Sequence, residues 1–148
     1  MQPTPAESSH LPPSRAGSLT FVGGAPCFDF ANTSSGRGTP LRQEHLRSYE
    51  LLLVWCAHAG LLSAPARRAL RRLADARPAA AARVLRRALA LREAIHAAGA
   101  ALAHAEPPPP TALRVISREL AAAMAQARLR RIKGAFVLDW AGQPPALD

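Results

Sequence analysis

The sequence predicts an α+β domain, predominantly helical, with about four helices packed on a small and mostly antiparallel sheet. Three observations predict this fold class. Apolar side chains recur at helical spacing through the Ala-, Leu- and Arg-rich run from residue 41 to 127. Short β-type runs flank this helical region, at 19–33 and at 128–140. We expect the two flanking β regions to join one sheet beneath the helices.

The chain has the size of one domain, since its 148 residues can bury a sizeable core without disulfides or metals. Residues 1–17 are rich in Pro and Ser and lack periodicity, which predicts a disordered tail. Residues 18–140 form the predicted domain. We expect residues 141–148 to form a second tail, with no zinc ribbon after it.

The least repetitive stretch opens the domain, with short β-type runs at Leu19–Val22 and Cys27–Ala31 around a Gly-Gly turn. In a strand, Asp29 would lie on the face opposite the two Phe rings. Asn32 and Thr33 follow at once, so an acid, an amide and a hydroxyl come close together. Two interpretations stay open: these groups bind a ligand, or they only satisfy the backbone of a local turn.

The first helix is predicted over residues 41–58, and Gly60 is its expected stop. Its second half is apolar on every side, so we expect Leu53 and Trp55 in the core. A second helix starts at Ser63, a good N-cap followed by an early proline. Its outward face is predicted to carry four arginines, either as a solvated face or as a nucleic-acid patch: Arg67, Arg68, Arg71 and Arg72.

A long helix is predicted over residues 79–105, and Arg92 falls inside its apolar stripe. A guanidinium stays charged, so Arg92 there needs a carboxylate, a carbonyl or a ligand as a partner. We predict that Arg92 pairs with Asp29, directly or through a bound molecule. The alternatives are a purely structural ion pair and an arginine that extends from the edge of the stripe into solvent.

After four prolines, a last helix is predicted over residues 111–127. Lys133-Gly134 then separates two β-type runs, at 128–132 and 135–140, which predicts a hairpin. The first of these strands is basic through Arg128, Arg130 and Arg131.

The net charge is +9, and all basic residues except Lys133 are arginines. A basic chain favours polyanionic partners, although Arg-, Ala-, Pro- and Gly-rich composition also follows from GC-rich coding. The two cysteines and five histidines lack the paired spacing of a zinc site, so we expect no metal and no cofactor. Neither a signal peptide nor a membrane span is recognisable, so we expect a cytoplasmic protein.

Three motifs in order resemble the ABATE domain, which opens the bacterial CGNR zinc-finger family of stress-induced transcription regulators. The first is FVGGAPCFDFANT at 21–33, similar to the family's Phe-x-Gly-Gly and Asp-Phe-x-Asn-Thr. The second is LLVWCAHAGLL at 52–62, similar to Leu-x-x-Trp-x-x-x-x-Gly-Leu. The third is LREAIH at 91–96, similar to Leu-Arg-x-Ala-Ile, in which Arg92 is the family's arginine.

The resemblance implies a regulatory domain rather than an enzyme, and no catalytic triad, metal cluster or phosphate loop contradicts this. Family members continue into a zinc ribbon that carries Cys-Gly-Asn-Arg. This sequence lacks the ribbon, so we expect a single-domain remnant or a fragment, and zinc or ribbon-borne DNA contacts are not carried over.

We therefore expect a small molecule as the main partner, with DNA and a second copy of the chain as further candidates and no membrane. The candidate ligand-binding residues are Asp29, Asn32, Thr33, Trp55 and Arg92. The alternative function is a basic nucleic-acid-binding module without base specificity. Its candidate residues are Arg67, Arg68, Arg71, Arg72, Arg128, Arg130 and Arg131.

Overall fold

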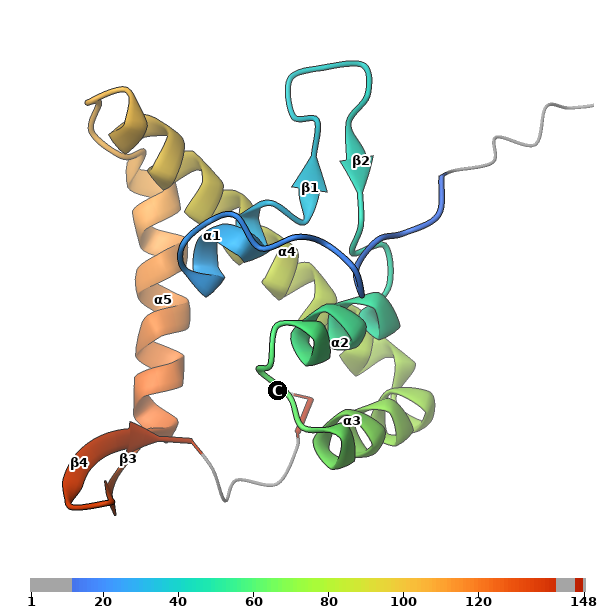
Figure 1. Ribbon diagram of the computed structural model, residues 1–148, viewed down its shortest axis with the longest axis vertical. Coiled ribbons are helices and arrows are strands. Elements are labelled where there is room, and N and C mark those ends of the chain that lie inside the picture. The colour runs from blue at the N-terminus through green and yellow to red at the C-terminus, as the bar shows by residue number, and fades with distance from the viewer. Residues whose placement is uncertain (1–11, 141–145, 148) are drawn as a thin grey trace, which may run out of the picture.

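The computed structural model describes residues 12–140 and 146–147. The fold is α+β and predominantly helical, as predicted, and Figure 1 shows the long helix α4 running through its middle. Helices α1, α2, α3 and α5 all pack against α4. The elements are α1 (Pro26–Ala31), β1 (Ser34–Ser35), β2 (Gln43–Glu44), α2 (Tyr49–His58), α3 (Ala64–Ala76), α4 (Pro78–Ala103), α5 (Pro110–Gln126), β3 (Arg128–Ile132) and β4 (Ala135–Asp139).

The helix boundaries at the α2–α3 junction agree with the sequence signals. Gly60 has a φ of 71°, and the N–H of Leu61 donates to the Cys56 carbonyl at 2.8 Å, which closes α2. Ser63 caps α3, because its hydroxyl accepts the N–H of Ala66 at 3.3 Å. Both ends therefore use capping residues that are visible in the sequence.

The start of α2 differs from the prediction, because the helix begins at Tyr49 and not at residue 41. The Ser48 hydroxyl accepts the Leu51 N–H at 3.2 Å and is the actual N-cap. The residues before it include β2, which pairs with β1 in antiparallel fashion. An apolar stripe that continued upstream of Ser48 made the helix look longer than it is.

The predicted strand at Cys27–Ala31 is wrong, since this run is the six-residue helix α1. Pro26 occupies its first turn, where a missing N–H costs nothing. The ring of Phe28 lies against α4 at Gly99, where a Cβ atom would stand 3.2 Å from that ring. Short apolar runs fit helix and strand equally well, and packing on α4 decides in favour of the helix.

The C-terminal hairpin is confirmed, with Arg130 opposite Val137 and Lys133-Gly134 at its turn. Lys133 and Gly134 have φ values of 49° and 87°, the backbone of a tight two-residue turn. The expected single sheet is wrong, because β1–β2 and β3–β4 form two separate two-stranded sheets. Cys27–Ala31, which we expected to be a strand of that sheet, belongs to helix α1 instead.

The main core lies where α2 meets α4, with Leu46, Leu52 and Trp55 buried together. Trp55 and Leu53 are both 2% exposed, which confirms them as core residues. Ala16 is buried in the same cluster, so the predicted disordered tail is wrong for residues 12–17. The rest of that tail, residues 1–11, lies outside the described part of the chain.

A smaller cluster lies where α3 meets the start of α4. It contains Ala80, Ala81 and Leu147, with Leu70 and Leu73 packed against them. Leu147 belongs to the predicted second tail, of which residues 141–145 and 148 are outside the described residues. Across residues 12–140, no helix combines the length and the apolar character that crossing a membrane requires.

Candidate functional site

Arg92 is the centre of a buried polar network on α4. Its side chain is 2% exposed. Its Nη1 donates to Glu44 Oε1 at 2.6 Å and its Nη2 to Glu44 Oε2 at 2.5 Å, a bidentate pair. Nη1 also lies 3.3 Å from the Thr33 hydroxyl. The arginine thus holds the β1–β2 hairpin against α4.

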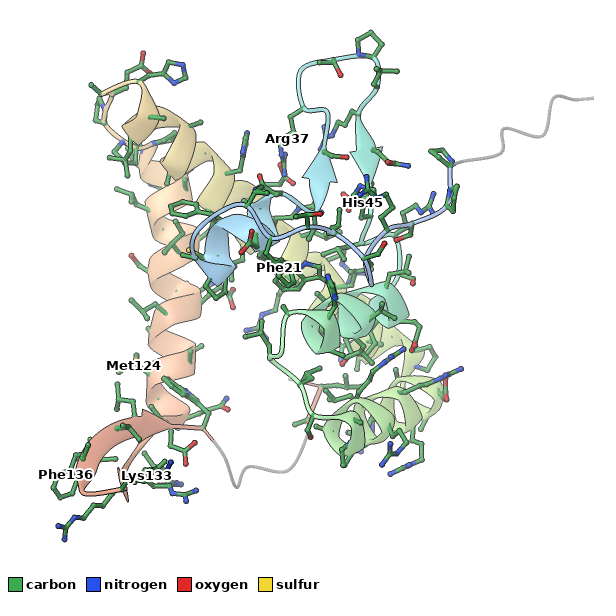
Figure 2. All side chains as sticks on the ribbon, in the orientation of Figure 1. Phe21, Arg37, His45, Met124, Lys133 and Phe136 are labelled. Atoms are coloured by element: carbon green, nitrogen blue, oxygen red, sulfur yellow. The ribbon has the colours of Figure 1, made fainter. Side chains whose placement is uncertain are left out.

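Glu93 extends the network toward the loop between β1 and β2. It accepts from Arg92 Nε at 3.0 Å and pairs with Arg37 through both carboxylate oxygens. Arg37 Nη2 also donates to the Ala31 carbonyl at 3.3 Å, at the end of α1. Figure 2 shows Arg37 between the β1–β2 hairpin and α4. Two arginines and two glutamates therefore tie α1, the hairpin and α4 together.

The pairing keeps both carboxylates charged. Hydrogen bonds from Arg37 lower the pKa of Glu93 to about 2, against the opposing effect of burial, and Arg92 adds to the shift. Burial would raise the pKa of Glu44, but hydrogen bonds from Arg92 and from the Leu46 N–H outweigh it and lower that pKa. The network is charge-balanced, which is the condition for burying a guanidinium.

His45 follows β2 and anchors the segment before the domain. The Arg15 N–H donates to His45 Nδ1 at 3.2 Å, and the Ser14 hydroxyl donates to the His45 carbonyl at 2.7 Å. Nδ1 is therefore an acceptor, so the proton is on Nε2, which lies 3.1 Å from the Ser35 hydroxyl. Burial, followed by the charge of Arg15, lowers the pKa of His45. A neutral imidazole is what this arrangement requires.

An apolar groove of about 380 Å³ lies between α1, α2 and α4. The rings of Phe30 and Trp55 meet at its base, with centroids 5.1 Å apart. The indole Nε1 of Trp55 is buried and has no hydrogen-bond partner among the described residues. Its lining includes Cys27, Phe30, Trp55, Cys56, Ala88 and Leu91.

Comparison with known protein families shows a match. The model of the ABATE family, whose description reads "Putative stress-induced transcription regulator", matches residues 24–148. The chain belongs to the ABATE family. Neither the curated proteins nor the solved structures contain a significant match. The family match confirms the resemblance seen in the three motifs, and it begins within the first of them.

In this ABATE domain, the predicted pair of Asp29 and Arg92 is wrong. Asp29 Oδ1 accepts from the N–H groups of Val22 and Gly23, at 2.8 and 2.7 Å. It therefore holds the loop that leads into α1, which is the local-turn alternative. Arg92 is buried in the apolar stripe as predicted, but its carboxylates come from Glu44 and Glu93.

The other candidate ligand-binding residues lie in different places. Thr33 is buried and joins the Arg92 network, and its hydroxyl donates to the Phe30 carbonyl at 2.7 Å. Asn32 is exposed and lines a second hollow of about 170 Å³ on the other side of α1, next to His96. Trp55 lines the apolar groove. The structure thus brings Thr33 and Arg92 together and leaves Asn32 and Trp55 at separate hollows.

The basic candidates of the ABATE domain form two groups on opposite sides of the lower part of Figure 1, on α3 and on β3. On α3, Arg67 and Arg71 pair with Glu50, at 2.8 and 3.8 Å. Arg68 and Arg72 are exposed, and no described carboxylate pairs with them. On β3, Arg130 pairs with Asp139 at 2.8 Å, while Arg128 and Arg131 are exposed.

The sequence prediction missed Glu44, Glu93, Arg37 and His45. Glu93 adjoins Arg92, but neighbouring helix positions do not share a face, so adjacency gave no signal. A charge balance could have found Glu44, since a buried arginine needs a carboxylate and the chain has 10 acidic residues. Within the described residues, no three His, Cys, Asp or Glu side chains are arranged to hold a metal ion.

Proposed function

We propose that this ABATE domain is the sensing part of a transcription regulator, acting in the cytoplasm without catalysing a reaction. Its groove between α1, α2 and α4 would bind a small, mainly apolar molecule. The groove volume of about 380 Å³ lies within the roughly 300–1,000 Å³ range of small-molecule sites. The proposal agrees with the family description as a regulator.

One observation carries the proposal: Pro, Cys, Phe, Leu, Trp, Ala and Ile side chains line the groove, and it exposes almost no polar surface. Covering apolar surface is favourable by roughly 25 cal/mol per Å², so an apolar molecule that covers these side chains gains affinity. The expected ligand is therefore an apolar ring or chain. A charged ligand does not fit, because no charged side chain lines the groove.

The position of the groove also suggests how binding would be transmitted. Cys27 and Phe30 on α1, Trp55 on α2 and Leu91 on α4 all face the ligand space. Helix α1 is short and ends where Arg37 holds the Ala31 carbonyl. A ligand that fixes α1 against α4 would therefore stabilise the β1–β2 hairpin as well.

The test uses the neutral dye Nile red as a probe. We expect saturable binding to the parent chain and strong loss of binding in Ala88→Phe, which fills the groove. Ala90→Phe is the matched control, because Ala90 is an exposed residue of the same helix. Equal binding by the parent and Ala88→Phe would refute the proposal.

A second candidate function is nucleic-acid binding through α3, favoured by the exposed Arg68 and Arg72 one turn apart. Duplex DNA should then bind with a steep salt dependence and no base preference. The variant Arg68→Ser/Arg72→Ser should reduce both affinity and salt slope. The control Arg83→Ser/Arg86→Ser, on the exposed face of α4, should leave them unchanged.

A further inference from the structure

The β3–β4 arm, residues 128–139, projects from the end of α5. Every residue from 128 to 138 is exposed. At its base, the Trp140 indole N–H donates to the Ala123 carbonyl at 2.7 Å. Figure 2 shows Phe136 and Lys133 at the outer end of the arm. An exposed two-stranded ribbon has two open edges, and each can pair with another strand.

The two edges of the arm differ in charge. Strand β3 carries Arg128, Arg130 and Arg131, and such charges discourage pairing along an edge. Strand β4 reads AFVLD and carries no charge before Asp139. Its Phe136 and Leu138 are 68% and 49% exposed. The uncharged apolar edge of β4 is therefore the one suited to pairing.

The register defines which backbone groups of β4 are open. In a hairpin with a two-residue turn, the residues that flank the turn exchange hydrogen bonds, and such pairs then alternate along the ladder. Ala135 and Val137 are thus bonded to β3, opposite Ile132 and Arg130. The N–H and C=O groups of Phe136 and Leu138 consequently point to the free edge.

We propose that two copies of the chain associate through β4, in antiparallel fashion about a twofold axis at Val137. Phe136 of one copy then lies opposite Leu138 of the other, and the open groups of both residues satisfy each other. The arrangement is self-complementary, as a twofold interface requires. Two two-stranded arms become one continuous sheet, with Phe136, Leu138 and Leu129 on the same face.

The same geometry disfavours pairing through β3. An antiparallel pair about Arg130 would place Arg130 opposite its own copy, and like charges directly opposite each other are destabilising.

The net charge of +9 adds long-range repulsion between copies. The β4 pair is also smaller than a standard protein interface. We therefore expect a dimer that dissociates on dilution and strengthens with salt.

Sedimentation velocity over a range of concentrations tests the proposal. The parent should shift from monomer to dimer as concentration rises. Phe136→Pro removes the open N–H without breaking the β3 ladder, so this variant should stay monomeric. Leu129→Pro is the matched control, since it removes the corresponding N–H on the outer edge of β3, and it should dimerise like the parent. A monomeric parent at all concentrations would overturn the proposal.

A crosslink tests the register. At Val137 the two copies form a pair that exchanges no hydrogen bonds, with Cα atoms about 4.5 Å apart, which a disulfide can bridge. In a Cys27→Ser background, Val137→Cys should form a covalent dimer under mild oxidation, and Arg130→Cys should not. Equal crosslinking of both variants would contradict pairing through β4.

Nucleic acid is the other partner that this arm could contact. If the parent stays monomeric but binds duplex DNA, and Arg128→Ser/Arg131→Ser abolishes the binding, the arm is a DNA contact and the dimer proposal fails.

Discussion

The two β-ribbons of this ABATE domain are held in opposite ways. The β1–β2 hairpin has two residue pairs, yet Ser34 is buried in it and Glu44 forms an ion pair with Arg92. The β3–β4 arm has five residue pairs, yet its side chains are exposed up to Leu138. The number of ladder pairs therefore does not tell which ribbon is integrated into the domain. Contacts with α4 tell which ribbon is integrated. The β1–β2 hairpin makes such contacts, and they bury polar groups that are satisfied only when the hairpin is folded.

Breaking the Arg92 network should have the largest effect. Arg92→Met leaves the partly buried Glu44 without its partner, and breaking such pairs costs about 3–5 kcal/mol. Urea unfolding measures the loss. Arg131→Met, in the exposed arm, is the control and should stay within about 0.5 kcal/mol of the parent. The double variant Arg92→Met/Glu44→Leu should recover part of the loss. Equal stability of Arg92→Met and Arg131→Met would contradict the difference between the two ribbons.

Acid should weaken the β1–β2 hairpin next. The pKa of Glu93 falls from 4.5 to about 2 on folding. Its contribution is thus complete above pH 4.5 and disappears as the pH falls toward 2. Glu93 is 44% exposed, so solvent screening reduces this contribution to about 1–2 kcal/mol. Unfolding free energies of the parent and of Glu93→Gln should therefore converge between pH 4.5 and 2. If the unfolding free energies of the parent and of Glu93→Gln instead differed by the same amount at every pH, Glu93 would not stabilise the fold through its ion pairs.

The smallest effect is expected in the arm. Leu129 is 67% exposed, so Leu129→Ser removes no buried contact and should change the unfolding free energy by less than about 0.5 kcal/mol. Unfolding should be measured at low protein concentration, where the chain is monomeric. A loss above 1–2 kcal/mol, typical of core truncation, would mean that the arm is packed against the domain.

Local chemistry made the α2–α3 junction and the C-terminal hairpin predictable. Gly60, Ser63 and the Lys133-Gly134 turn act through their own backbones, so the sequence shows them directly. The run Cys27–Ala31 was not predictable in this way. Its apolar pattern fits strand and helix equally well, and the helix packs on α4, where Phe28 lies close to Gly99.

The candidate site was predictable in kind and not in detail. An arginine within an apolar stripe needs a carboxylate, a carbonyl or a ligand, which is why the burial of Arg92 and its need for a partner could be predicted. Glu44 as that partner depends on where the β1–β2 hairpin crosses α4, a contact between residues far apart in sequence. Periodicity carries no information on such contacts.

The two thiols at the groove between α1, α2 and α4 differ in a way that chemistry can use. Burial raises the pKa of Cys56 to about 11, so at neutral pH its thiol stays protonated and slow to alkylate. Cys27 lines the same groove and is exposed. A maleimide fluorophore should therefore attach to Cys27 first. The natural chain thus offers a labelling position beside the groove, where emission would report on occupancy without any engineered residue.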